Sequence, residues 1–82
     1  MPRYVIILST AINTPTDLRH VFQSVNFFSG IFEWSVDLDD CDKILRIVCG
    51  NNISLELVKI LKSGGVNSLV LEIFDENGIS II

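Results

Sequence analysis

The chain has 82 residues, of which 49% are hydrophobic, and its formal net charge at pH 7 is −4. A chain of this length supports one domain with a single core. Its acidic balance and six scattered basic residues argue against a nucleic-acid-binding protein, which needs clustered Lys and Arg. We therefore expect residues 1–82 to form one domain, with the core in residues 4–74 and a turn and tail in residues 75–82.

The first segments have the patterns of a strand and a helix. Residues 4–10, Tyr-Val-Ile-Ile-Leu-Ser-Thr, are rich in β-forming side chains and predict a buried strand. Apolar side chains then recur at helical spacing, at Leu18, Val21, Phe22, Val25 and Phe28. This spacing predicts an amphipathic helix that ends at Ser29-Gly30.

A hairpin is predicted in the middle of the chain. Apolar and polar residues alternate over residues 32–38, which predicts a half-buried strand whose apolar set is Phe32, Trp34, Val36 and Leu38. Residues 39–42, Asp-Asp-Cys-Asp, are a polar turn, and residues 43–49 form the returning strand.

A second helix and a last strand complete the pattern. Residues 51–54, Asn-Asn-Ile-Ser, offer N-cap candidates for the helix, and residues 63–65, Ser-Gly-Gly, end it. Residues 66–74 follow as a strand. The order β-α-β-β-α-β is typical of the α+β ferredoxin-like sandwich, with two helices on one face of a four-stranded antiparallel sheet.

The C-terminal tail contains a hairpin-turn signal. Asn77-Gly78 favours a tight turn because both positions tolerate positive φ. Residues 79–82 then form a short fifth strand beside the preceding one, or remain a frayed terminus.

Residues 30–37, Gly-Ile-Phe-Glu-Trp-Ser-Val-Asp, resemble a segment of heavy-metal-associated domains, the copper-chaperone-like fold. In those domains Gly-Val-x-x-Val/Trp-x-Val-Asp links the first helix to the second strand, and the resemblance covers residues 4–74. The family binds soft metals through a Cys-x-x-Cys pair in the loop before the first helix. Those positions fall on Thr14 and Asp17, and neither is a thiol. Because copper(I) selects sulfur ligands, the resemblance implies the scaffold without its thiolate metal site.

The same residues have the chemistry of a helix start. Thr14 is a good N-cap, and Pro15 suits the first helical position because its missing N–H has no helical partner there. Asp17 follows at the third helical position, where a carboxylate completes a capping box and complements the helix dipole.

Other candidate metal ligands are sparse. His20 with Asp17 offers two ligands, fewer than a typical zinc site, so we interpret His20 as a solvated helix residue. The aspartates around the hairpin lack the glycine and distal glutamate of an EF-hand, and aspartate is common in turns; they are Asp37, Asp39, Asp40 and Asp42. We expect no bound metal and no cofactor.

The two cysteines, Cys41 and Cys49, flank one predicted strand. They are too far apart along an extended chain for a disulfide between them. Cys49 is interpreted as a small core residue. One histidine and turn aspartates also supply no nucleophile–base pair, so we predict that the chain is not an enzyme.

The sheet face away from the helices is unusually apolar for a solvent-facing surface. Alternation along the predicted strands places six apolar residues there: Val5, Ile7, Ile44, Val48, Val70 and Phe74. Grouped on adjacent strands, such side chains favour an interface or cover from residues 79–82.

Three functions are compatible with these features. We favour a non-catalytic interaction module that associates with itself or another protein through its sheet. A metal-binding accessory protein using Asp17 and His20, or ligands from a neighbouring chain, is the alternative. A small-molecule sensing domain has less support, because no glycine-lined loop marks a ligand pocket.

The sequence also gives an expected location. Met1-Pro2-Arg3 precedes an apolar run of residues 4–8, shorter than the roughly 7–15 residues of a secretory core or the roughly 20 of a membrane span. Unpaired thiols suit a reducing compartment. We therefore expect a cytoplasmic protein without a membrane segment.

Overall fold

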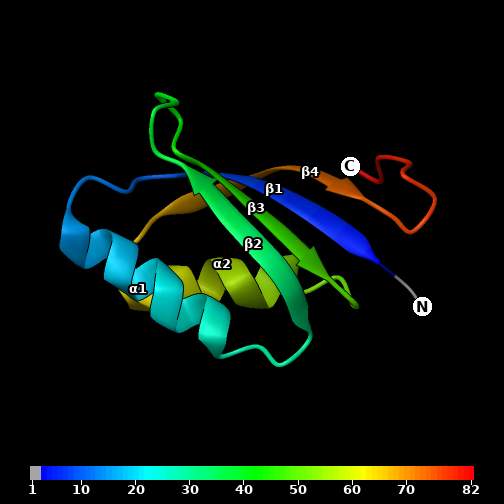
Figure 1. The fold of residues 1–82 in the computed structure, drawn as a ribbon, viewed down its shortest axis with the longest axis horizontal. Helices are drawn as coiled ribbons and strands as arrows, with labels where there is room; N and C mark the ends of the chain where they lie inside the picture. Colours follow the sequence, from blue (N-terminus) through cyan, green and yellow to red (C-terminus); the bar gives the residue numbers. More distant parts are fainter. Residues whose placement is uncertain (1–2) are drawn as a thin grey trace.

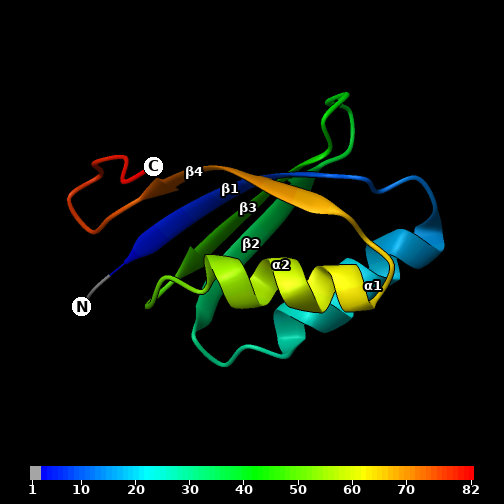
Figure 2. The same ribbon diagram turned by 180° about the vertical axis from the view of Figure 1, so that it is seen from behind.

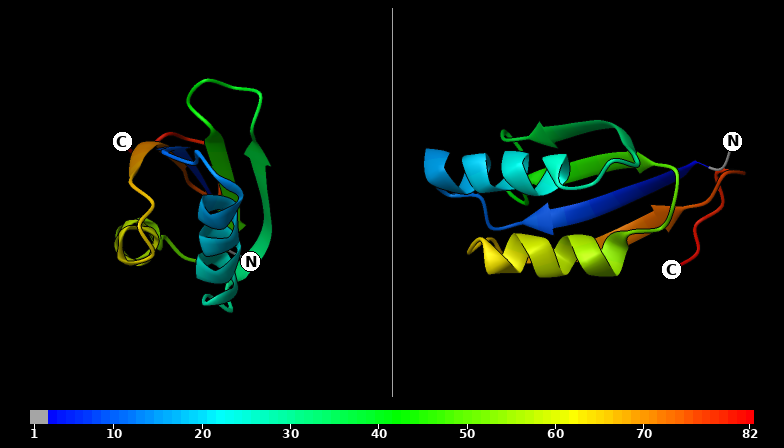
Figure 3. Two further views of the ribbon diagram at one scale, coloured as in Figure 1. Left: turned by 90° about the vertical axis from the view of Figure 1, so that its left-hand side faces the viewer. Right: turned by 90° about the horizontal axis from the view of Figure 1, so that it is seen from below.

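Four antiparallel strands and two helices make up the structure, a computed structural model that describes residues 3–82. In chain order they are β1 (Tyr4–Thr10), α1 (Pro15–Asn26), β2 (Ile31–Asp37), β3 (Ile44–Cys49), α2 (Ser54–Ser63) and β4 (Ser68–Phe74). The sheet order is β2-β3-β1-β4, and both helices cover one face of the sheet (Figures 1 and 3). The predicted ferredoxin-like βαββαβ sandwich is confirmed.

The core lies between the helices and the sheet. Alternate residues of the two central strands supply one half, with Ile6, Leu8, Leu45 and Ile47 fully buried. The helices supply the other half through Val21, Val25, Leu57 and Leu61. Burying each such side chain contributes about 1.5–3 kcal/mol, so this two-layer contact is the main source of stability.

Helix α1 begins where the sequence predicts and ends earlier. Thr14 is its N-cap and Pro15 its first residue, but the helix stops at Asn26 rather than continuing to Phe28. The Phe28 amide donates to the Val25 carbonyl in a final tight turn. Phe28 therefore still packs against the core, whereas Phe27 is 71% exposed.

The predicted alternation of β2 is wrong at its start. A bulge between Ile31 and Glu33 inserts Phe32 as an extra residue opposite β3. Ile31 therefore packs against the core together with Trp34 and Val36. Phe32 is 52% exposed, so it is not part of the buried set.

The predicted placement of Val70 on the face away from the helices is wrong, because of a second bulge. β4 begins at Ser68 rather than Val66, and its register with β1 shifts between Ile7 and Leu8. Val70 consequently pairs with the buried Leu8 and packs against the core. Its neighbour Leu69 takes the opposite side and is 64% exposed.

The C-terminal end of α2 matches the prediction from the sequence, and its N-terminal end does not. Its N-cap position is Ile53, which makes no side-chain cap, and the Asn52 side chain instead accepts a hydrogen bond from the Ser54 amide. None of the polar N-cap candidates therefore takes that position. The C-terminal end is as predicted, because Gly64 caps the helix and Gly65 has φ +88°.

The tail turns back beside β4 without forming a fifth strand (Figure 2). Phe74 and Ser80 make one isolated bridge, and the Ile81 amide donates to the Ile73 carbonyl. The turn contains three residues, 76–78, because the Asp75 amide donates to the Ile79 carbonyl. Gly78 alone in this turn has positive φ, at +76°. The predicted chain reversal is confirmed, and the strand is not.

Three loops meet at one end of the molecule (Figure 1). They are the β1–α1 loop, the β2–β3 hairpin loop and the α2–β4 loop. The Thr10 amide donates to the Asp42 carbonyl, and the Ala11 amide donates to the Asn67 carbonyl. These two hydrogen bonds fix the position of the loop that precedes α1.

Candidate functional site

Thr14 and Asp17 close the start of α1 with a reciprocal capping box. The Thr14 hydroxyl accepts a hydrogen bond from the Asp17 amide at 3.1 Å. In return, Asp17 Oδ2 accepts from the amides of Asn13 and Thr14, at 2.9 and 3.2 Å. Amides that lack helical partners are satisfied in this way. The predicted helix start is confirmed at both residues.

The electrostatics of Asp17 follow from these hydrogen bonds. The hydrogen bond from the Asn13 amide is the main reason that the Asp17 pKa lies below its ordinary value. The carboxylate is therefore ionised and already engaged. A soft metal selects sulfur ligands, whereas this loop presents a hydroxyl and a carboxylate that both form hydrogen bonds within the capping box. The residues present do not fit copper(I).

His20 contacts the end of α2 while its side chain stays partly exposed, so it is less solvated than the sequence interpretation implied. The side chain is half-buried, and a Cβ built on Gly64 would lie 3.0 Å from His20 Nδ1. A glycine at the end of α2 thus makes room for the imidazole. The position gives His20 a packing role between the helices.

A cavity of about 380 Å³ opens beside the loop. It is lined by Ile12, Asn13, Thr14, Pro15, Leu18, Leu38 and Lys43. Lys43 has φ 47°, a conformation that favours glycine, and its Nζ donates to the Leu38 carbonyl at 2.8 Å. Two residues of the hairpin, Leu38 and Lys43, thus form part of the cavity wall, which the sequence did not predict.

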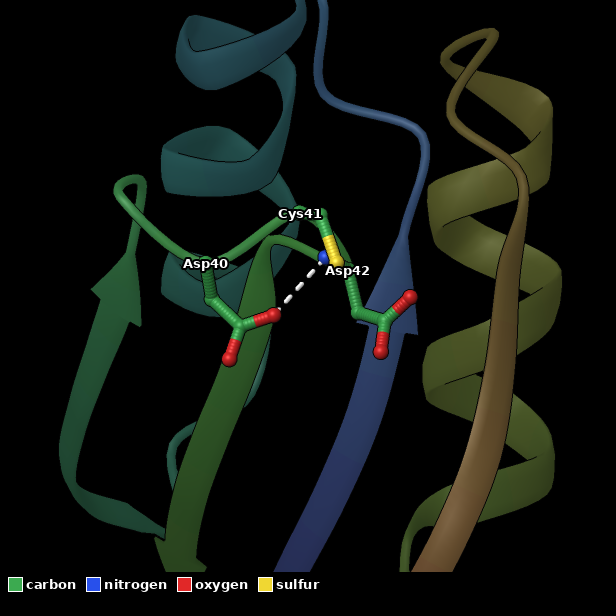
Figure 4. A group of neighbouring side chains, drawn as sticks. All are labelled: Asp40, Cys41 and Asp42. Carbon is green, nitrogen blue, oxygen red and sulfur yellow. Dashed lines mark hydrogen bonds between the residues drawn. The ribbon is translucent and has the colours of Figure 1, made fainter.

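Among residues 3–82, three neighbouring side chains bring potential metal ligands together, at Asp40, Cys41 and Asp42 (Figure 4). Their ligand atoms lie within 4.8 Å of one another. Asp40 Oδ1 accepts from the Asp42 amide, and Asp37 Oδ1 accepts from the amides of Asp39 and Asp40. Asp37 and Asp40 thus make the side-chain-to-backbone hydrogen bonds typical of turns, in agreement with the sequence interpretation of these two residues.

The two cysteines occupy different environments. Cys41 is exposed in the hairpin, whereas Cys49 is 1% exposed at the far end of β3. Burial raises the pKa of the Cys49 thiol, and its Sγ lies 3.0 Å from the Asn51 carbonyl oxygen. Both thiols are free, and Cys49 belongs to the core as predicted.

The outer face, the side of the sheet away from the helices, is organised in rows by strand pairing. One row joins Glu33, Val48, Val5 and Phe74, and the next joins Ser35, Arg46, Ile7 and Glu72. Beyond these two rows, Asp37 pairs with Ile44, and Ser9 pairs with Leu69. Apolar side chains thus lie on the central strands β3 and β1 of the outer face, interrupted by the exposed Arg46, and carboxylates lie on the edge strands.

Five of the six predicted interface residues lie on the outer face, and Val70 does not. Val5, Ile7, Ile44 and Phe74 are partly exposed there, whereas Val48 is 3% exposed and offers little surface. Leu69 takes the place expected for Val70. The continuous apolar run of residues 69–71 hides the bulge, so no sequence signal distinguishes Leu69 from Val70.

The described helices include none that is long and apolar enough to span a membrane.

Several solved structures share this fold. The N-terminal domain of PacS from Synechocystis PCC6803 matches at TM-score 0.69 and 12% identity, over 83% of this chain and 97% of that one. The copper(I)-loaded first domain of the human copper chaperone for SOD1, CCS, matches at TM-score 0.66 and 15% identity, over 83% and 92%. The yeast copper transporter domain Ccc2A matches at TM-score 0.68 and 11% identity, over 83% and 94%.

The chain therefore has the fold of heavy-metal-associated domains. No protein-family model matches it, and no curated protein matches by sequence. At identities of 11–15%, the likeness establishes the fold alone.

Proposed function

We propose that this chain is a non-catalytic interaction module, built on the scaffold of metal-binding domains and associating through its outer face. The observation that carries the proposal is the capping box. The residues in place of the family's two metal-binding cysteines already satisfy the start of α1, and neither offers sulfur, which supports a scaffold without a soft metal in this loop. The partly exposed apolar residues of the outer face supply a contact surface instead.

A matched pair of proteins tests the metal part of the proposal. The double substitution Thr14→Cys and Asp17→Cys restores a Cys-x-x-Cys pair on the same backbone. We expect copper(I) to bind this variant and not the wild-type chain, as measured by competition with a chromogenic chelator in the presence of reductant. Wild-type binding as tight as that of the variant contradicts the proposal and favours the metal-binding alternative.

Site-specific photo-crosslinking tests the interaction part. A photoreactive amino acid replaces Ile7 on the outer face in cells that make the chain, and the matched control replaces Leu55 on α2, which is 75% exposed. We expect a discrete crosslinked species from position 7 and none from position 55. No species from position 7, or the same species from both, contradicts an interface on the outer face.

A further inference from the structure

The charges of the molecule are divided unequally between its two layers. The helices carry two of the ten carboxylates and three of the six basic residues: Asp17, Glu56, Arg19, Lys59 and Lys62. The other eight carboxylates lie in the strands, the hairpin loop and the tail turn, with Arg3, Lys43 and Arg46. The sheet layer is therefore strongly negative, and the helix layer is slightly positive.

Carboxylates border the apolar residues of the outer face on three sides. Glu33 and Asp37 lie on β2 at one edge, and Glu72 lies on β4 at the other. Figure 4 shows Asp40 and Asp42 above the ends of β3 and β1, with the helices behind the sheet. Arg46 is the one basic residue in the paired rows of the outer face.

We infer that the outer face docks a basic amphipathic segment of a protein partner. Aliphatic side chains of that segment cover Val5, Ile7 and Phe74, while its Lys or Arg side chains reach the bordering carboxylates. Charge complementarity of this kind speeds association and selects the partner. The inference rests on the proposed function and adds the chemistry of the partner.

A second copy docked through the same face fits less well. A two-fold interface places identical patches against each other, so the bordering carboxylates of both copies meet. Like charges facing each other across an interface oppose association. The unequal charge thus favours a partner of opposite sign over a symmetric dimer.

Two probe peptides and the full chain test the inference. One peptide alternates Leu with Lys, and the other is identical except that Glu replaces Lys. Binding is followed by amide chemical shifts of the ¹⁵N-labelled chain and by titration at two salt concentrations. We expect the Lys peptide alone to bind, to shift the amides of β1, β3 and β4, and to weaken as salt rises.

Matched charge variants make the test specific. Glu33→Gln, Asp37→Asn and Glu72→Gln together should weaken binding of the Lys peptide about tenfold. The control neutralises three carboxylates away from the paired rows, with Glu56→Gln, Asp75→Asn and Glu76→Gln. This variant should change the affinity for the Lys peptide by less than about twofold. Equal effects of the two triple variants overturn the inference, because they indicate general attraction to an acidic protein.

The outcomes separate this inference from the proposed function. Equal binding of both peptides, or a crosslink from position 7 to a second copy of this chain, overturns the basic partner and leaves the outer face as an interface. Shifts confined to the helices, with no crosslink from position 7, overturn both.

Discussion

At the scale of single residues, Thr14, Asp17 and His20 occupy positions that invite a metal-site interpretation, yet each has a structural role. Thr14 and Asp17 satisfy the amides at the start of α1. His20 packs against Gly64 of α2. Polar residues at a functional position in a fold therefore need to be judged by their own hydrogen bonds and contacts.

Removing the Asp17 carboxylate should make stability depend differently on pH. Hydrogen bonds lower the folded-state pKa of Asp17 below 3.8. The ionised carboxylate therefore stabilises the fold above that pH, and this stabilisation is lost as pH falls through the folded-state pKa. We expect Asp17→Ala to be less stable than wild type at neutral pH, with a difference that narrows below pH 3.8. Denaturant titrations across pH measure this, with Glu76→Gln as the control for loss of a charge. A difference that persists unchanged in acid contradicts the assignment.

A double-mutant cycle tests the contact between His20 and Gly64. In the wild-type background, a Cβ at residue 64 meets the imidazole at 3.0 Å, so Gly64→Ala should be destabilising. In the His20→Ala background the same change should be neutral or stabilising, which gives a coupling energy of about 1 kcal/mol. Gly30→Ala is the control, because a Cβ there meets nothing within 4 Å. Equal effects of Gly64→Ala in both backgrounds would show that the His20 imidazole does not restrict the side chain at residue 64.

At the scale of elements, two bulges decide which apolar side chains face the helices. The bulge in β2 buries Ile31 and exposes Phe32, and the shift between β1 and β4 buries Val70 and exposes Leu69. A one-residue shift moves each following side chain to the other face of the sheet. The composition of the outer face therefore depends on these two irregularities.

Alanine substitutions at neighbouring positions of β4 test its register. Val70→Ala removes core contacts and should lower the free energy of unfolding by about 1–2 kcal/mol. Leu69→Ala should change it by less than about 0.5 kcal/mol because that side chain is 64% exposed. Chemical denaturation of both variants gives the comparison. The reverse order contradicts the bulge and supports the regular alternation.

At the scale of the whole molecule, one core joins the two layers, and Cys49 lies inside it. Cys41 lies outside it, exposed in the hairpin loop. The two thiols therefore report on different events. Modification of Cys41 requires no opening of the structure, whereas modification of Cys49 requires exposure of the core.

Thiol labelling measures the opening of this core. A chromogenic disulfide reagent should modify Cys41 rapidly in the native protein, and the Cys41→Ser variant should isolate the slow reaction of Cys49. We expect the Cys49 rate to rise with denaturant in parallel with unfolding followed by circular dichroism. Rapid labelling of Cys49 without denaturant contradicts a closed core at the end of β3.

The order of elements, the start of α1 and the lack of thiols in its loop were determined by the sequence alone. Each depends on local information: the spacing of apolar residues, the capping chemistry of Thr14 and Asp17, and the glycines after α2. Tertiary contacts, by contrast, set the faces of Phe32 and Val70, the packing of His20 and the single bridge of the tail. Those features depend on strand register and on contacts between elements distant in the sequence. The apolar periodicity of a single strand does not encode where a bulge places two of its residues opposite one residue of the neighbouring strand.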